Sequence, residues 1–222
     1  MKIFLFIIII CLLFNGDFGI MMASEERKLL DAHNNIRQFV IPNASNMVMM
    51  LWSVNLAQLA DKYSFRCDPV NPQEIAWLGL SANSYISFGD HRLNVDNAIL
   101  NWTEPRKRWK FPDVCPSEPS CSPYTRMIWS ETKEVGCNQN RCPGTRLQFH
   151  LACLYNPSDE EFVAPFNAGI PCSKCPEGYS YCRNNLCFGM TELDSFNSIT
   201  CSKYLWIFFL IYSMNQLINL LN

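Results

Sequence analysis

The sequence has little net charge and lacks the motifs by which common hydrolases are recognised. Its 222 residues carry 18 basic and 20 acidic side chains, a formal net charge of −2 at pH 7. A nucleic-acid-binding surface needs clustered basic charge, so this balance argues against such a partner. Only 3 histidines occur, and there is no G-x-S-x-G or H-E-x-x-H motif. The usual signatures of serine hydrolases and zinc peptidases are therefore missing.

Cysteine, in contrast, is abundant. The chain has 12 cysteines, of which Cys11 and Cys201 lie close to its two ends. The other ten form an even set, and in an exported chain such a set is typical of five disulfides. Sequence alone allows many pairings among them. They are Cys67, Cys115, Cys121, Cys137, Cys142, Cys153, Cys172, Cys175, Cys182 and Cys187.

The N-terminal end is typical of an exported protein. Lys2 precedes an unbroken apolar run over residues 3–14, which is too short to span a bilayer and has the length of a secretory signal core. We expect residues 1–23 to be a signal peptide, with Ala23 as a small residue at the cleavage site. An uncleaved anchor is the alternative. The mature protein is therefore expected to be extracellular.

The C-terminal end is apolar as well. Residues 204–222 form an apolar tail after a polar spacer over residues 191–203, and no Lys or Arg follows Lys203. An apolar tail without a basic flank is typical of a lipid-anchor signal. A short membrane anchor is the close rival, and a buried or frayed tail is the third interpretation. Under the first two the tail holds the protein at the cell surface.

Hydrophobic periodicity predicts three helices. Residues 24–39 carry apolar side chains at helical spacing, with Ser24 as the N-cap. Residues 53–65 form a second amphipathic segment with Ser53 as its N-cap. The third helix covers residues 93–109 and is interrupted near its proline.

Alternating apolar residues predict strands in the second half of the chain. Residues 147–156 alternate over their whole length, and residues 81–87 and 134–137 are shorter strand candidates. From residue 165 onward the sequence is rich in Pro, Gly and closely spaced Cys. This segment has too little apolar mass for a core of its own, so disulfides must hold it together.

An ordered set of short motifs runs through the chain. In order they are His33-Asn34-Asn35-Ile36-Arg37, Met50-Leu51-Trp52-Ser53, a helical segment ending at Cys67, Tyr124-Thr125-Arg126-Met127-Ile128-Trp129, Val135-Gly136-Cys137, Cys142-Pro143 and Leu151-Ala152-Cys153-Leu154-Tyr155-Asn156-Pro157. Each motif alone is weak. Together, in this order and spacing, they resemble the CAP superfamily of cysteine-rich secretory, antigen-5 and pathogenesis-related proteins. The venom-allergen-like and glioma-pathogenesis-related branches are the most similar.

The resemblance implies a fold and a disulfide pattern. The fold is α+β, a three-layer α-β-α sandwich known as the CAP or SCP domain, expected over residues 24–164. A short disulfide-rich hinge is expected over residues 165–190. The family pairing would join Cys67 to Cys142, Cys137 to Cys153, Cys115 to Cys121, Cys172 to Cys182 and Cys175 to Cys187.

The resemblance also implies a central cavity whose metal ligands are lost here. Family members often place two His and two Glu in this cavity, and some bind a divalent metal there. In this chain Pro123 matches one His, Ala82 matches one Glu, and no His follows Cys67 where the other is usual. Only Glu104 matches the fourth position, and one carboxylate cannot hold zinc. We therefore expect no metal, no cofactor and no enzymatic activity.

Three other side chains qualify as functional candidates. Arg126 stands where the family has Gln and could contact an anionic ligand group; pairing with Glu131 or Glu134 is the alternative. His33 is expected to be structural, packed or hydrogen-bonded beneath the sheet. His150 is expected to be exposed or packed rather than a base.

Two glycosylation sequons are present, at Asn43 and Asn101. The sequence thus predicts a non-enzymatic binding module, secreted or anchored at the cell surface. By family resemblance its partner would be a lipid, a sterol or an extracellular protein, met through exposed loops such as residues 43–50 and 115–121. The alternatives are a peptidase-like or metal-dependent enzyme and a structural surface coat protein.

Overall fold

The protein is described here from a computed structural model that covers residues 18–88, 94–112, 115, 120–142, 148–160 and 163–189. The apolar run predicted to be a signal-peptide core, the polar spacer and the apolar tail lie outside the described residues. In chain order the elements are α2 (Phe18–Gln38), β1 (Leu51–Trp52), α3 (Val54–Phe65), α4 (Pro72–Ala76), β2 (Ser81–Phe88), α5 (Val95–Thr103), the 3₁₀-helix η1 (Glu104–Lys107), α6 (Ser122–Met127), β3 (Glu134–Cys142), β4 (Gln148–Asn156), β5 (Tyr181–Arg183) and β6 (Leu186–Phe188).

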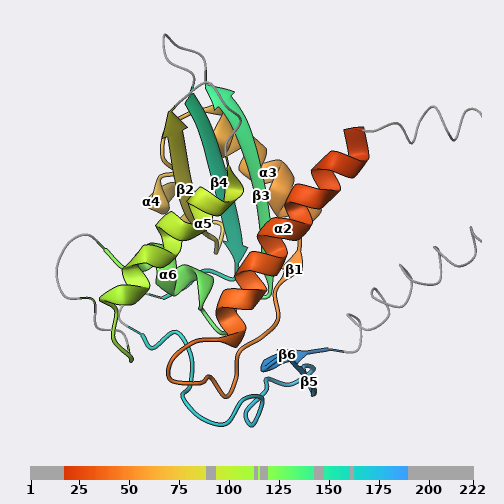
Figure 1. Cartoon of the computed structure of the whole chain (residues 1–222), viewed down its shortest axis with the longest axis vertical. Helices are drawn as coiled ribbons and strands as arrows, with labels where there is room; N and C mark the ends of the chain where they lie inside the picture. Colours follow the sequence, from red (N-terminus) through yellow and green to blue (C-terminus); the bar gives the residue numbers. More distant parts are fainter. Residues whose placement is uncertain are drawn as a thin grey trace, which may run out of the picture.

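A four-stranded sheet forms the middle layer of the fold. Its strand order is β1-β3-β4-β2, with β1 parallel to β3 and the other neighbours antiparallel. One core cluster joins the sheet to α2, α5 and α6, and another joins it to α3 and α4. Figure 1 shows α2 and α5 crossing one face of the sheet while α3 lies behind it. The fold is therefore the expected three-layer α-β-α sandwich.

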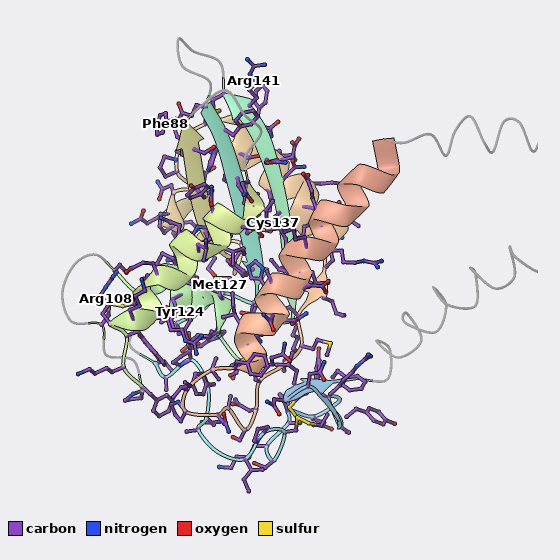
Figure 2. The ribbon with its side chains drawn as sticks, in the orientation of Figure 1. Phe88, Arg108, Tyr124, Met127, Cys137 and Arg141 are labelled. Atoms are coloured by element: carbon purple, nitrogen blue, oxygen red, sulfur yellow. A yellow bond between two sulfur atoms is a disulfide. The ribbon has the colours of Figure 1, made fainter. Side chains whose placement is uncertain are left out.

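Strand β4 supplies core residues to both helical layers. Leu151, Cys153 and Tyr155 pack in the cluster that contains Leu29 of α2. The intervening Ala152 and Leu154 pack in the cluster formed by α3 and α4. Since successive side chains of a strand point to opposite faces, one central strand serves both layers. In Figure 2, Cys137 of the neighbouring strand β3 lies in the interior between the sheet and α2.

The structure contains the five disulfides that the family resemblance implies. They join Cys67 to Cys142, Cys115 to Cys121, Cys137 to Cys153, Cys172 to Cys182 and Cys175 to Cys187. Cys137 and Cys153 are register partners on adjacent strands, so this bridge crosses the centre of the sheet. The bridges to Cys182 and Cys187 hold the small β5–β6 hairpin, whose strands are each 3 residues long.

Of the two predicted N-caps, one is confirmed and the other is wrong. Ser53 caps α3, and its hydroxyl accepts a hydrogen bond from the Leu56 amide at 3.5 Å. Ser24, in contrast, is not an N-cap, because α2 begins at Phe18. No proline or glycine lies between Gly19 and the predicted helix, so the helix extends through Ser24. The helix predicted over residues 93–109 is shorter in the structure. The α-helix α5 ends at Thr103, and the 3₁₀-helix η1 continues it to Lys107.

The prediction that residues 43–50 form an exposed loop is wrong. Met47, Val48 and Met50 are fully buried. The C-terminal hinge packs on Met47 and Val48, and Met50 packs in the core cluster that contains Leu29 of α2. The Cys187 amide donates to the Met47 carbonyl at 2.7 Å, and the Met49 amide donates to the Cys187 carbonyl at 2.9 Å. The hinge is too small for a core of its own. It packs on the sandwich and forms backbone hydrogen bonds with it.

Candidate ligand-binding cleft

A cleft of about 400 Å³ opens along the outer edge of the sheet. Its walls come from β2, α4, α5 and α6 and from Ser158 and Asp159, which follow β4. Figure 1 shows β2 as the edge strand, with α4 beside it. Apolar side chains form much of the wall, among them Ile75, Leu80 and Trp102. The volume lies in the range of small-molecule sites, roughly 300–1,000 Å³.

Two side chains occupy hydrogen-bonding positions along the free edge of β2. Arg126 Nη1 donates to the Ala82 carbonyl at 3.0 Å. Trp102 Nε1 donates to the Ser84 carbonyl at 3.0 Å. An uncovered edge strand exposes a row of backbone donors and acceptors to other chains. Here α5 and α6 cover that edge and leave the cleft beside it.

Arg126 also faces a carboxylate across the cleft. Its Nε lies 3.4 Å from Oδ1 of Asp159, and the two side chains are only 19% and 12% exposed. The alternative that Arg126 pairs with Glu131 or Glu134 is therefore wrong. Glu134 instead accepts a hydrogen bond from Asn156 at 2.8 Å. Arg126 pairs with Asp159 because the residues that follow β4 bring Asp159 to the end of α6.

Behind the cleft runs a chain of buried hydrogen bonds from Asn83 to α2. Asn83 donates to the Tyr155 hydroxyl at 3.1 Å, and that hydroxyl lies 2.9 Å from His33 Nε2. His33 Nδ1 lies 2.7 Å from the Leu29 carbonyl. A carbonyl can only accept, so Nδ1 carries the proton and Nε2 accepts from Tyr155. The chain joins the sheet to α2 through neutral groups.

Burial decides the protonation states of His33 and Tyr155 in this series of hydrogen bonds. Desolvation lowers the pKa of His33 to about 4, and the nearby positive charge of Arg37 acts in the same direction. Desolvation also raises the pKa of the Tyr155 hydroxyl. His33 is therefore neutral at physiological pH and carries a structural hydrogen bond, as its position on the apolar stripe predicts. His150 is fully buried too, with Nδ1 3.2 Å from the Ser64 carbonyl.

The Cysteine-rich secretory protein (CAP) family profile matches residues 30–155, which include β1, β2, β3 and all but the last residue of β4. This protein belongs to the CAP family. It is 31% identical over 179 residues to mouse (Mus musculus) peptidase inhibitor 16, matching 78% of this chain and 35% of that protein. It is 32% identical to zebrafish (Danio rerio) peptidase inhibitor 15-A, matching 72% of this chain and 68% of that protein. The chain thus spans about a third of the first relative's length and two thirds of the second's.

A solved structure has the same fold. Venom allergen-like protein 4 of Schistosoma mansoni superposes with a TM-score of 0.50 at 27% identity, over 67% of this chain and 97% of that protein. Together with the family match, this similarity identifies the sandwich described above as a CAP domain. The cleft at its β2 edge therefore lies in a CAP domain.

The CAP metal cavity does not fit a metal in this chain. Ala82 and Pro123 both line the cleft, and neither has a side-chain atom that can ligate a cation. Glu104 does not join them: its exposed carboxylate accepts a hydrogen bond from Arg108 at 2.8 Å. Within the described ranges, one group of three potential metal ligands occurs, formed by Cys172, Cys175 and Cys187. All three sulfurs are in disulfides, so they offer no thiolate.

Arg37 is a buried polar residue whose role sequence analysis did not predict. It lies within α2 and is 1% exposed. Its guanidinium donates to the backbone carbonyls of Val48, Met127, Trp129, Ser130 and Thr132. One signal was available, because Arg37 follows His33 by four residues and so shares its helix face. That spacing places Arg37 on the side of α2 that faces the sheet.

The two sequon asparagines are both exposed. Asn43 lies between α2 and β1, and Asn101 lies within α5 at the wall of the cleft. Within the described residues, no helix is both long and apolar enough to cross a bilayer.

Proposed function

We propose that this CAP protein is a non-catalytic extracellular binding protein that holds a lipid in the cleft at the β2 edge. The observation that carries the proposal is the composition of the cleft. Its apolar walls enclose a volume of about 400 Å³, and the titratable residues among those described in its lining are Arg126 and Asp159, which face each other. A site of this kind suits an apolar molecule with a small polar end.

The same lining argues against catalysis. Among the described lining residues there are serines but no histidine, cysteine, lysine or glutamate. A serine nucleophile needs an adjacent base to remove its proton. Ser84 is already engaged, since its hydroxyl accepts a hydrogen bond from the Val70 amide at 3.1 Å. The alternative of a peptidase-like or metal-dependent enzyme therefore has little support in the cleft.

Exposed apolar side chains beside the cleft favour a lipid over a protein ligand. Trp77 is 91% exposed and Leu78 is 56% exposed. They directly follow α4, whose Ile75 and Ala76 line the cleft. An exposed tryptophan next to leucine is typical of a side chain that enters the membrane interface. Such contact would bring the cleft next to the lipid surface from which it takes its ligand.

Extraction of bound lipid tests the proposal. The full-length protein is purified from a eukaryotic secretory host, extracted with organic solvent and analysed by mass spectrometry. We expect one lipid class at close to one molecule per protein. Ala76→Trp, which places a large ring at the cleft wall, should lose most of it. Gln73→Trp on the same helix, exposed and outside the cleft lining, is the matched control. Protein that carries no lipid and takes up none would refute the proposal.

Peptidase inhibition is a second candidate, favoured by the names of the two relatives described above, peptidase inhibitor 16 and peptidase inhibitor 15-A. An inhibitor acts through a surface that fills the active site of the peptidase, so Ala76→Trp should leave inhibition unchanged. A panel of serine, cysteine and metallopeptidases assayed with the purified protein tests this candidate. If the protein neither binds lipid nor inhibits any peptidase, a structural coat protein becomes the better interpretation.

Membrane anchoring through the tail is part of the proposed display. A chain truncated after residue 190 is compared with the full-length chain in a eukaryotic host. We expect the full-length chain at the cell surface and the truncated one in the medium. Release by a phosphatidylinositol-specific phospholipase indicates a lipid anchor, and retention indicates a spanning segment. A full-length chain that is secreted with residues 204–214 still attached would contradict anchoring.

A further inference from the structure

A run of basic residues lies at and just beyond η1, where the third helical segment ends. Four of the five residues at positions 106–110 are basic, namely Arg106, Lys107, Arg108 and Lys110. The chain as a whole is slightly acidic, with a formal net charge of −2. Figure 2 shows Arg108 at the outer left of the molecule. The run is therefore a local positive surface on a chain that has no general excess of basic charge.

Two buried residues hold this segment against the domain and leave its cations facing outward. Pro105 and Trp109 are buried, and the Trp109 ring packs among the aromatic side chains of the neighbouring core cluster. The backbone between them closes into a turn, because the Trp109 amide donates to the Pro105 carbonyl at 2.9 Å. The side chains of Arg106, Lys107 and Lys110 are exposed. The cations are thus presented on a turn whose position is fixed by the core.

Within the part of the chain that the structure describes, only one of the four cations is neutralised by a carboxylate. Arg108 pairs with Glu104 at 2.8 Å, and the other three form no ion pair with a described carboxylate. Arg106 Nη2 donates to the Phe39 carbonyl at 3.1 Å, a neutral group that fixes the guanidinium without cancelling its charge. Three uncompensated cations close together attract a partner with several negative charges.

The compartment narrows the chemistry of that partner. Five disulfides are typical of a protein that works in an oxidising, extracellular environment. Short runs rich in Lys and Arg are typical of surfaces that bind nucleic acid or heparin, and outside the cell the second class of polyanion applies. Guanidinium and ammonium groups both donate charge-assisted hydrogen bonds to the oxygens of such anions.

We propose that Arg106, Lys107 and Lys110 form a binding surface for a sulfated polysaccharide of the heparan sulfate class. Lys107 and Lys110 are three positions apart, so their Cα atoms lie within about 11 Å of each other, and one short sulfated stretch reaches both. None of the three residues lines the cleft at the β2 edge, so this surface is independent of lipid binding. Its role is to hold the protein at glycan-covered surfaces.

An anionic membrane is the rival partner for this surface. Phe39, whose carbonyl bonds Arg106, is 58% exposed, and an apolar side chain beside cations is typical of a membrane-contacting surface. Two observations favour the polysaccharide. The tryptophan of the basic run, the type of side chain best suited to the membrane interface, is buried in the core. Anionic lipids are also concentrated in the cytoplasmic leaflet, which an extracellular protein does not meet.

Binding to immobilised heparin tests the proposal. The full-length protein from a eukaryotic secretory host is passed over heparin, over heparin with its sulfates removed, and over phosphatidylcholine vesicles with and without phosphatidylserine, and binding is followed by surface plasmon resonance. We expect binding to sulfated heparin and no gain from phosphatidylserine. Heparin binding should weaken about tenfold or more between about 50 and 200 mM NaCl, because each bound cation releases counterions from the polyanion.

A pair of double variants makes the test specific to the residues. Lys107→Gln/Lys110→Gln removes two exposed cations that have no partner in the core, so heparin binding should fall about tenfold or more while the melting temperature is unchanged. Arg27→Gln/Lys62→Gln is the matched control. It changes exposed residues of α2 and α3 and alters the net charge by the same amount, so it should bind heparin as the wild type does.

Three results would overturn the proposal. Equal losses in the two double variants would show that heparin responds only to net charge. Binding that survives removal of the sulfates would show that the anionic groups are not recognised. Binding to phosphatidylserine vesicles that Lys107→Gln/Lys110→Gln abolishes, without binding to heparin, would assign the surface to a membrane. None of these results affects the lipid-binding cleft, which Ala76→Trp tests separately.

Discussion

The guanidinium of Arg37 donates two hydrogen bonds to the carbonyl oxygen of Val48, from Nε at 3.0 Å and from Nη2 at 2.7 Å. Among the described residues no carboxylate forms an ion pair with it; four further carbonyls between Met127 and Thr132 complete its contacts. Burial lowers its pKa to about 9, so it stays charged at neutral pH. One cation thus joins α2 to two loops.

Arg37→Lys should destabilise the domain strongly. A lysine ammonium has three donors and cannot reproduce the six hydrogen bonds of the guanidinium, so carbonyls are left buried and unpaired. We expect a loss of about 3 kcal/mol or more in the free energy of unfolding, measured by chemical denaturation. Arg27→Lys on the same helix, where the side chain is exposed, should cost much less. Equal effects would show that the carbonyl contacts are not important for stability.

Stability should fall with acidification through His33. Its pKa is about 4 in the folded protein against an ordinary value of 6.5, so the unfolded chain takes up the proton first as the pH falls. The His33 contribution is therefore complete above pH 6.5, declines from pH 6.5 to 4 and levels off below pH 4. The loss is about 3 kcal/mol. Burial also lowers the pKa of His150, which adds to the same slope.

Thermal melting between pH 7.5 and 4 measures this dependence. His33→Gln removes one titrating group, so its melting temperature should depend less on pH than that of the wild type. A variant with the same slope as the wild type would show that His33 does not titrate in this range.

Gly136→Ala should prevent folding or nearly so. A Cβ at Gly136 would overlap backbone atoms of Ser53, Leu56 and Ala57, because the first turn of α3 packs directly on β3. Backbone atoms cannot move aside as a flexible side chain can, so the cost should exceed about 3 kcal/mol. The measurement is the secreted yield and melting temperature. Arg141→Ala on the same strand, at the far end in Figure 2 and exposed, should be secreted normally.

The protein should bind no zinc specifically. Ala82 and Pro123, which stand where the family resemblance implies ligands, line the cleft without a ligating atom, and Glu104 pairs with Arg108. Calorimetric titration of protein without a histidine tag should show no saturable site in the micromolar range. A stoichiometric zinc site lined by Glu104 would contradict this prediction.

Local pattern was enough to predict the main elements. The apolar spacing of residues 53–65 and the Ser53 cap predict α3, and the alternation of residues 147–156 predicts β4. Both depend on neighbours within a few positions along the chain, which periodicity reports directly. The disulfide pairs and the three layers needed the family resemblance, because spacing alone does not select one pairing. The same resemblance identified Ala82, Pro123 and Arg126 as positions of interest.

Only the tertiary structure determines which partners Arg37, Arg126 and Asn83 bind. Arg37 bonds carbonyls up to 95 residues away, and the partner of Arg126 is Asp159, not a nearby glutamate. Met47 and Val48 are buried because the hinge, more than 100 residues later, packs on them. Asn83 bonds the Pro123 carbonyl and Arg126 bonds the Ala82 carbonyl only because α6 lies against the edge of β2. Periodicity shows which face of an element is buried; the backbone atoms that cover that face come from distant parts of the chain.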